Sequence, residues 1–208
     1  LEGLEVLRDP QGTIFGRNAS VGAINLRSAL PRDELSGNLT GEVGSGGRYM
    51  LDGYVNLPVN DQVAFRIAAR AETMDGLYEN QFNGDDIGGY DSISTRVTSR
   101  IDFTPDFQLI LRANYSDLDH DGFTLYQLLP DTFPPGGLAA YEARCAGVGA
   151  ICVDNDPFDT KVNRNPEGYG GLTDVQWGGS ATAILDTPSG FSFRFLANYQ
   201  DWDNNQEK

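Results

Sequence analysis

The sequence predicts an all-β protein that forms part of a transmembrane antiparallel β-barrel, with about seven strands. Three observations support this prediction: apolar and polar residues alternate in segments of about ten residues, the connections between segments are alternately short and long, and glycine is abundant. The chain has 208 residues, of which 25 are glycine. Glycine is penalised inside helices and supplies unusual backbone conformations in turns, so a helical bundle is excluded.

The alternation is strictest in residues 62–72, where valine, phenylalanine, isoleucine and alanine at every second position alternate with glutamine, arginine and glutamate. Strict alternation of this kind is typical of a strand with one apolar and one polar face. The predicted strands are residues 35–46, 48–58, 62–72, 90–104, 107–115, 174–187 and 191–203.

The connections between these segments indicate an orientation. Residues 58–61, 104–106 and 187–190 are tight turns rich in proline, aspartate and glycine, whereas residues 77–89 and 121–173 are long. Transmembrane barrels have short periplasmic turns and long extracellular loops. No stretch approaches the roughly 18 to 20 apolar residues of a membrane-spanning helix, so the strands would have to cross the membrane.

An internal repeat supports the same orientation. Residues 107–119 align without gaps on residues 191–203, and each copy follows a Thr-Pro turn. The aromatic residues then form two girdles, as in membrane barrels. Those expected near the turn end are Phe65, Phe103, Phe107 and Phe191, and those near the loop end are Tyr115, Trp177 and Tyr199. Periodicity alone leaves one alternative, an antiparallel sandwich whose aromatic residues share a core.

The charge of the chain argues against nucleic acid as a partner. Lysine and arginine number 15 against 30 aspartate and glutamate residues, which gives a formal net charge of −15. No cluster of basic residues is present that would neutralise a phosphate backbone. We therefore expect no nucleic-acid partner.

Residues 1–27 do not follow the strand pattern and read LEGLEVLRDPQGTIFGRNASVGAINLR. This segment resembles the end of the plug domain of TonB-dependent outer-membrane receptors, whose usual form is (I/V)EVLRGPQG(T/S)(L/I)(Y/F)GRNA(T/S)GGAINI. The matching plug-motif residues are Glu5, Arg8, Pro10, Gln11, Gly12, Gly16, Arg17, Asn18, Gly22 and Asn25. Asp9 stands where the family has glycine, which questions any left-handed backbone there, and Val21 replaces a common glycine.

The resemblance implies a domain division and a location. Residues 1–31 would be the C-terminal part of the plug, and residues 35–208 the first strands of a barrel of about 22 strands. The chain would then be a piece of a longer protein in the outer membrane of a Gram-negative bacterium, in contact with outer-membrane lipid. The box that contacts TonB would precede this piece. The resemblance implies no cofactor.

The function implied by the resemblance is active uptake of a ferric siderophore or a similar large, scarce nutrient, driven by TonB. Two alternatives stay open: a passive porin-type channel, and a soluble secreted all-β binding module. An enzyme is not expected, because His120 is the single histidine and a Ser-His-Asp triad would have to be built around it.

Alternation places a set of arginines on the face that would line the barrel lumen. These wall residues are Arg66, Arg70, Arg96, Arg100, Arg112 and Arg194. Pairing at equal distances from the turns would bring Arg66 near Arg100 and Arg70 near Arg96. The arginines would hold plug carboxylates such as Glu2 or Glu5, stabilise an anionic ferric chelate, or form a solvated wall balanced by Asp52, Glu72 and Asp102.

Asp117, Asp119 and Asp121 spell the first half of a calcium-binding loop, and we treat them as a weak calcium candidate. An EF-hand loop would need a glutamate at position 128, where Leu128 stands. No other metal site is expected.

The long loop of residues 121–173 carries two further features. Cys145 and Cys152 are expected to form a disulfide in an oxidising outer compartment. A connection of this length is usually functional or disordered, and its aromatic residues are candidates for ligand capture by stacking. These candidates are Phe123, Tyr126, Phe133, Tyr141, Phe158 and Tyr169.

Overall fold

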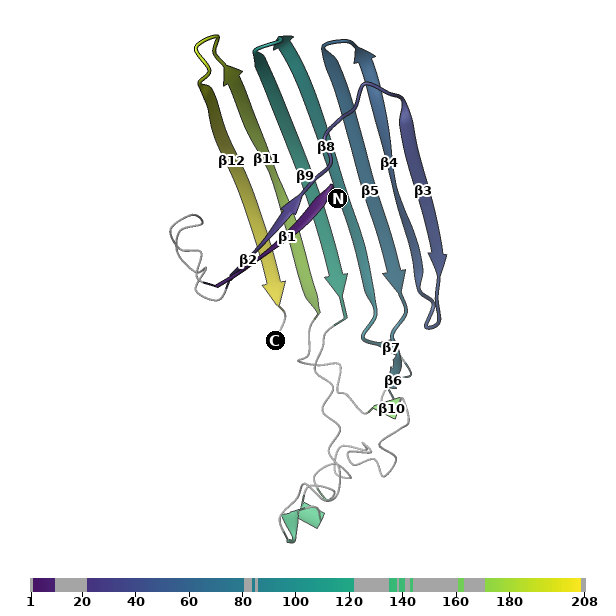
Figure 1. The fold of residues 1–208 in the computed structure, drawn as a ribbon. Coiled ribbons are helices and arrows are strands. Elements are labelled where there is room, and N and C mark those ends of the chain that lie inside the picture. Colours follow the sequence, from purple (N-terminus) through teal and green to yellow (C-terminus); the bar gives the residue numbers. More distant parts are fainter. Residues whose placement is uncertain are drawn as a thin grey trace.

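The structure is a computed structural model, and it describes residues 2–9, 22–80, 84, 86–121, 135–137, 139–140, 143, 161–162 and 171–206. Its main element is a seven-stranded sheet in the order β12-β11-β9-β8-β5-β4-β3 (Figure 1). These strands are β3 (Ser36–Val43), β4 (Tyr49–Asn60), β5 (Val63–Met74), β8 (Tyr90–Thr104), β9 (Phe107–His120), β11 (Leu172–Asp186) and β12 (Ser192–Gln206). Every pair of neighbouring strands in this sheet is antiparallel.

The predicted seven antiparallel strands are thus confirmed, and some of them are longer than predicted. β9 continues to His120, beyond its predicted end at residue 115, because β11 supplies backbone partners as far as the pair Leu172 and His120. Short strands lie beyond the loop end of the sheet: β6 (Tyr78–Asn80), β7 (Asp86–Ile87) and β10 (Lys161–Val162). In the described residues, no helix is long and apolar enough to cross a membrane.

The sheet has one apolar face and one polar face. Large apolar side chains on the apolar face remain exposed, among them Val97 at 41%, Leu111 at 40% and Phe195 at 64%. Within the described residues, only Ala64, Ile87 and Ile110 are buried hydrophobic residues. A sandwich would cover the apolar face with a second sheet, and no described element does so, which argues against the sandwich alternative.

Aromatic side chains gather at two levels of the apolar face. At the loop end, Trp177 lies opposite Tyr115, and its ring centroid is 5.4 Å from that of Tyr199. At the turn end, the rings of Phe103 and Phe107 stack with their centroids 5.3 Å apart. These clusters correspond to the aromatic girdles of membrane barrels.

The register is sheared, which corrects one expectation. Arg66 pairs with Thr98 instead of Arg100, and Arg70 pairs with Ser94 instead of Arg96. The expectation assumed that strands pair at equal distances from their turns. The strands of a closed barrel are tilted and staggered, so each arginine faces a residue two positions away from the expected one.

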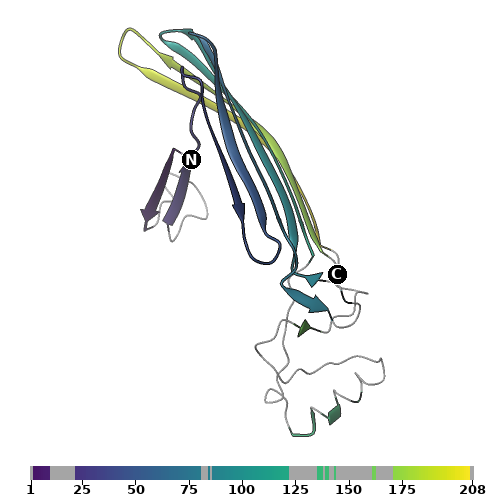
Figure 2. The same ribbon diagram turned by 90° about the vertical axis from the view of Figure 1, so that its right-hand side faces the viewer.

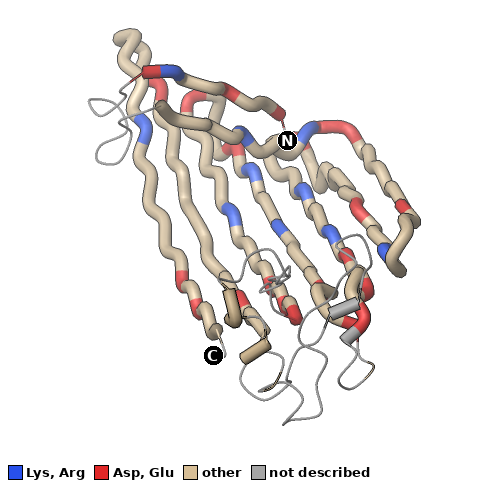
Figure 3. The backbone as a smooth tube through the Cα atoms, turned by 90° about the horizontal axis from the view of Figure 1, so that it is seen from below, with Lys and Arg blue, Asp and Glu red and all other residues tan. Residues whose placement is uncertain are grey.

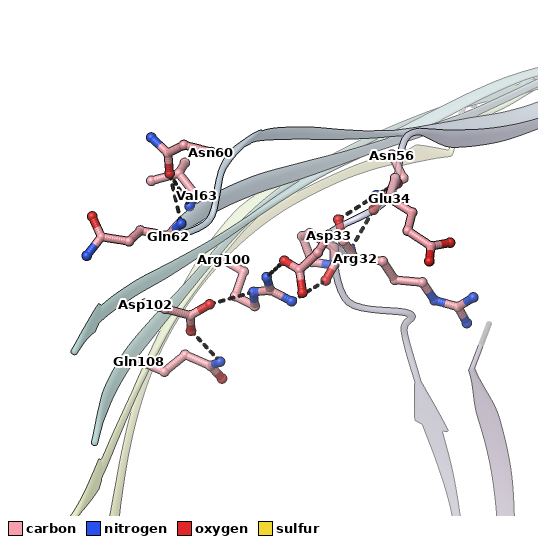
Figure 4. Close-up of polar contacts among 11 residues, drawn as sticks. Arg32, Asp33, Glu34, Asn56, Asn60, Gln62, Val63, Arg100, Asp102 and Gln108 are labelled. Atoms are coloured by element: carbon pink, nitrogen blue, oxygen red, sulfur yellow. Dashed lines mark hydrogen bonds and ion pairs between the residues drawn. The ribbon is translucent and has the colours of Figure 1, made fainter. Parts of the chain in front are cut away.

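The β4–β5 turn is closed by one side chain. The Asn60 carboxamide oxygen accepts hydrogen bonds from the backbone amides of Gln62, at 2.9 Å, and Val63, at 2.8 Å (Figure 4). An asparagine that bonds the backbone two residues ahead forms an Asx turn. This local contact explains why the connection is tight.

The plug-like segment forms a separate antiparallel hairpin of β1 (Gly3–Arg8) and β2 (Gly22–Arg27). The hairpin stands away from the sheet, on the side to which the polar face of the sheet points (Figure 2). Residues 28–35 connect β2 to β3, and we call them the strap. The strap runs back along the polar face towards the turn end of the sheet (Figure 1).

Two residues at the ends of the hairpin strands have positive φ angles, which most side chains disfavour. Asp9 has φ of 70°, so aspartate adopts the left-handed conformation where the family has glycine. Gly22 has φ of 151°, and a Cβ atom there would lie 2.5 Å from the Leu7 carbonyl oxygen. Glycine at position 22 is therefore required by both conformation and space.

Candidate functional site

The candidate site is the polar face of the sheet together with the strap that crosses it. Figure 3 shows the basic residues of the strands mostly away from the loop ends, where acidic residues are concentrated. In the register, Arg66 lies in β5, Arg96 and Arg100 in β8, and Arg112 in β9, all on this face. Strand alternation accounts for this, because every second residue points to the same side.

Asn56 of β4 makes the first attachment of the strap to the wall. Its carboxamide oxygen accepts a hydrogen bond from the Arg32 backbone amide at 2.8 Å. Its Nδ2 donates to the backbone carbonyls of Arg32, at 2.7 Å, and Glu34, at 2.5 Å (Figure 4). Asn56 is 0% exposed. Its amide thus satisfies strap backbone groups as a neighbouring strand would.

Arg100 of β8 makes the second attachment. Its guanidinium donates to the Pro31 carbonyl oxygen at 3.0 Å and forms an ion pair with the Asp33 carboxylate. Pro31 is almost completely buried. The Arg100 Nε lies 2.9 Å from an Asp102 carboxylate oxygen, with an orientation unsuited to a hydrogen bond. Arg100 therefore joins the strap to the wall and is itself neutralised by carboxylates on both sides.

Arg96 makes a third attachment, through a hydrogen bond of 2.5 Å from its guanidinium to the Ser28 hydroxyl. Ser28 is the first residue of the strap. The contacts of Arg96, Arg100 and Asn56 are thus distributed along the strap, which is held at several points.

Of the two plug carboxylates expected to meet the wall arginines, Glu2 lines a hollow together with Arg66 and Arg96, whereas Glu5 binds elsewhere. Glu5 forms an ion pair of 3.2 Å with Arg27 and accepts a hydrogen bond of 3.1 Å from Asn25, both inside the hairpin. Asp33, which the sequence did not single out, is the carboxylate that pairs with a wall arginine. Asn25 and Gly22 lie on β2, and Arg8 ends β1.

A second polar cluster lies at the loop end of the same face, around Glu72. Its carboxylate accepts hydrogen bonds from Arg48 at 2.8 Å, from Arg70 at 2.6 Å and from the Tyr90 hydroxyl at 2.8 Å. Arg48, in the β3–β4 turn, also pairs with Glu42. The hydrogen bonds to Glu42 and Glu72 raise the pKa of Arg48 above its ordinary value. This cluster joins the β3–β4 turn to β5 and β8 at the loop end of the sheet. The charges of its arginines are largely compensated by Glu42 and Glu72.

Three wall arginines differ from those above. The Arg66 guanidinium lies 3.6 Å from the centroid of the Tyr54 ring, in a cation–π contact. No carboxylate forms an ion pair with Arg66, Arg112 or Arg194 among the described residues. Arg112 lies between Thr98 and Ser180 in the register, and Arg194 lies on β12 opposite Ile184.

Two hollows open on the polar face. One of about 520 Å³ lies between strap and wall and is lined by Glu2, Ser28, Arg32, Tyr54, Arg66 and Arg96, among others. The other, of about 640 Å³, lies nearer the loop end; its lining includes Arg70, Arg96, Asn114, Ser116, Gln176 and Gln200. Arg96 lines both hollows. The Asp52 carboxylate also lines both hollows, so their surfaces combine basic, acidic and neutral polar side chains.

The calcium candidate does not form a coordinating group. The Asp117 carboxylate accepts a hydrogen bond of 2.9 Å from the Tyr115 hydroxyl, and Asp119 lies opposite Asp91. Within the described residues, no three acidic, histidine or cysteine residues are placed to hold a metal ion. The physical reason is the extended backbone, which separates alternate residues by roughly 7 Å instead of wrapping them around an ion.

The remaining sequence candidates lie outside the described residues. They are the plug-motif residues Pro10, Gln11, Gly12, Gly16, Arg17 and Asn18, the two cysteines Cys145 and Cys152, and the loop aromatics Phe123, Tyr126, Phe133, Tyr141, Phe158 and Tyr169.

These features define the class of protein. A sheared antiparallel wall has an uncovered apolar face with aromatic clusters at two levels, and its polar face carries a hairpin and a clamped strap. This arrangement is typical of a segment of a transmembrane β-barrel wall.

Comparisons with known proteins lead to the same class. The chain is 26% identical over 152 residues to the catecholate siderophore receptor Fiu of Escherichia coli, a match that covers 72% of this chain and 18% of Fiu. The chain thus spans about a fifth of that curated relative. No family model matches the chain.

Solved structures share the fold. The ferric yersiniabactin uptake receptor FyuA from Yersinia pestis superposes with a TM-score of 0.73 at 18% identity, over 99% of this chain and 29% of FyuA. The ferripyoverdine receptor of Pseudomonas aeruginosa gives a TM-score of 0.68 at 16% identity, over 95% of this chain and 23% of that receptor. The chain thus shares the fold of these outer-membrane receptors, and its residues 1–27 resemble the plug motif of TonB-dependent receptors.

Proposed function

We propose that the receptor to which this chain belongs imports a ferric siderophore across the outer membrane, with energy supplied through TonB. The observation that carries the proposal is the strap clamped to the polar face by Asn56 and Arg100. A hairpin with the plug motif, tied in this way to the lumen side of the wall, is what a barrel with an internal plug needs. The names of the similar receptors, for ferric yersiniabactin, ferripyoverdine and ferric catecholates, support a ferric siderophore as cargo.

We propose the matching division of the chain, with residues 1–31 as the end of the plug and residues 35–208 as the first part of the barrel. The strap contacts support a boundary at this position, because the chain leaves the hairpin and joins the wall between Ser28 and Ser36. The long loop, with its aromatic residues and cysteines, would capture ligand at the outer surface. The connection between β9 and β11, residues 121–171, starts and finishes at the loop end of the sheet, on the side opposite the tight turns.

The alternatives are less well supported. A passive channel has no use for a hairpin and strap fixed inside its lumen. A soluble binding module would need a partner for the apolar face, where Phe195 and Leu111 are exposed.

The experiment is uptake by the source bacterium under iron limitation. Deleting the gene of the intact receptor should abolish uptake of one radiolabelled ferric siderophore, and the intact gene in trans should restore it. A strain that lacks TonB should still bind this siderophore at its surface but fail to import it. Uptake that continues without TonB would favour the passive channel, and unchanged uptake of every ferric siderophore tested after gene deletion would refute the proposal.

A further inference from the structure

A third hollow opens on the apolar face of the wall, at the loop end of the sheet. It has a volume of about 630 Å³ and is lined by residues 41–43, 49–51, 71–73 and 91–93 and by Asp117 and Asp119. In the run 71–73 the middle residue, Glu72, points to the polar face, so its two neighbours point to the apolar face. We call this hollow the outer groove. Its volume is in the range of small-molecule binding sites.

One end of the outer groove is apolar. The register places Gly41, Leu51, Ala71 and Ile93 in one row across four neighbouring strands. A Cβ atom added at Gly41 would meet nothing within 4 Å, and the side chains of Leu51 and Ile93 are exposed. The small residues Gly41 and Ala71 thus leave an open floor between larger apolar neighbours. This end of the groove suits an alkyl chain.

The other end of the outer groove is acidic. The row continues from Ile93 to Asp117, and in the next row towards the loop end Asp91 lies directly opposite Asp119. Like charges directly opposite one another destabilise an antiparallel pair. Among the described residues, no ion pair joins these three carboxylates to a basic side chain. A cation that binds from outside would therefore stabilise this end.

The rest of a closed barrel cannot supply that cation from its strands. Both neighbours of β8 and both neighbours of β9 are strands of the described sheet. The arginines of the seven strands lie on the polar face, and the apolar face of these strands carries no lysine or arginine. The carboxylates at positions 91, 117 and 119 thus face away from the basic residues of the wall.

The aromatic cluster at the loop end indicates the level of the groove in a membrane. Tyr115 belongs to this cluster, and its hydroxyl donates a hydrogen bond of 2.9 Å to the Asp117 carboxylate. Aromatic girdles lie at the membrane–water interface. Asp117 and Asp119 follow Tyr115 towards the loop end, so they lie at the level of lipid headgroups. Leu111 and Val97, on the other side of Tyr115, belong to the part of the face that acyl chains would cover.

We propose that the outer groove binds one membrane lipid whose headgroup carries a primary ammonium. An acyl chain would lie over Leu51 and Ala71, and the ammonium would lie among the carboxylates of Asp91, Asp117 and Asp119. A primary ammonium has three N–H donors, which form charge-assisted hydrogen bonds with carboxylates. A headgroup with a net negative charge would be repelled by the same carboxylates. The inference concerns the outside of the wall and does not depend on the cargo of the receptor.

The first test measures headgroup preference. The intact receptor in detergent is given equal amounts of phosphatidylethanolamine, phosphatidylcholine and phosphatidylglycerol with identical acyl chains, and retained lipid is counted by native mass spectrometry. The wild type should retain one phosphatidylethanolamine, because the methylated ammonium of phosphatidylcholine cannot donate hydrogen bonds. Asp91→Asn/Asp119→Asn should weaken this retention about tenfold. The matched control is Asp201→Asn/Asp203→Asn, which changes two carboxylates on the same face of β12, outside the groove, and should behave as the wild type does.

Two results of this test would overturn the proposal. One is a wild-type receptor that shows no preference for phosphatidylethanolamine, which would mean that another part of the receptor covers the groove or that the groove stays open. The other is equal retention by the two double variants. Retention of phosphatidylglycerol that requires Mg²⁺ and is lost in a chelator would also overturn it, because the carboxylates would then bind an anionic lipid through a divalent ion.

The second test fills the apolar end of the groove without changing a charge. Ala71→Leu places a larger side chain on the floor of the groove and should reduce the retention of phosphatidylethanolamine severalfold. The control Ala197→Leu makes the same change at an exposed residue on the apolar face of β12, outside the groove, and should leave retention unchanged. Heat-modifiable mobility verifies that each variant is a folded barrel. A folded Ala71→Leu receptor that retains this lipid as well as the wild type does would overturn the proposal.

Discussion

Asn56 of β4 is completely buried because its side-chain amide pairs with both backbone groups of Arg32 in the strap. The pair connects the wall to the segment that follows the β1–β2 hairpin. Two further strap contacts, from Arg96 and Arg100, act in the same direction.

Replacing Asn56 by alanine should release the strap. The change removes three hydrogen bonds to the backbone of Arg32 and Glu34, each of which contributes about 0.5 to 1.5 kcal/mol. Because trypsin cleaves after arginine, we expect the bond between Arg32 and Asp33 to be protected in the intact wild-type receptor and cleaved in Asn56→Ala. The control is Asn38→Ala in β3, where the side chain is exposed and accepts a hydrogen bond from the Thr40 hydroxyl on the same strand. Equal cleavage of the wild type and both variants would show that the strap is not held by Asn56.

The ion pair between Arg100 and Asp33 should contribute less free energy to the attachment of the strap than the Asn56 hydrogen bonds do. The Arg100 side chain is 14% exposed, but that of Asp33 is 70% exposed, so solvent screens the pair. In a double-mutant cycle with Arg100→Gln and Asp33→Asn, we expect a coupling energy of about 1 kcal/mol or less. The coupling should decrease as salt is raised. The matched pair is Arg27 and Glu5, both well exposed, for which a smaller coupling is expected. A larger coupling for the exposed pair would contradict this ranking.

The two faces of the sheet should respond differently to a new charge. Leu111 lies on the apolar face and is 40% exposed. Leu111→Arg should cost about 2 to 4 kcal/mol in the membrane, because a guanidinium near the bilayer midplane loses its hydration. Gln108→Arg should cost little, because this residue lies on the polar face and already donates to Asp102 at 2.7 Å. Reversible unfolding of the intact receptor from lipid vesicles measures both. Similar losses for the two variants would mean that the faces are wrongly assigned.

The faces and most strand bounds could be predicted because alternation is a local property. The observed pairing differs from the expected one by two residues, an even shift that leaves Val97 and Leu111 on the same side of the sheet, so that error does not affect the assignment of faces. The pairing of Arg66 with Thr98 could not be predicted, since it depends on the stagger of the whole barrel.

The strap contacts of Asn56 and Asp33 could not be predicted from the sequence for a different reason. Asn56 reads as an ordinary polar residue at an alternating position, and Asp33 as one charge in a polar connection. Their roles depend on contacts between residues more than twenty positions apart, which no local pattern records. The plug motif predicted that the hairpin belongs inside the barrel, but not which residues attach it.

The two tryptophans of the chain provide the last prediction, because they lie on opposite faces at nearly the same level. Trp177 is on the apolar face beside Tyr115 and Tyr199, whereas the Trp202 indole donates to Asp174 at 2.7 Å on the polar face. In intact receptors that retain only one of them, reconstituted in vesicles, brominated lipid should strongly quench the fluorescence of Trp177, since quenching requires contact with the acyl chains. Trp202 should be quenched much less, and a soluble quencher that enters the lumen should affect it more. An exchange of these two responses would mean that the apolar and polar faces of the wall are wrongly assigned.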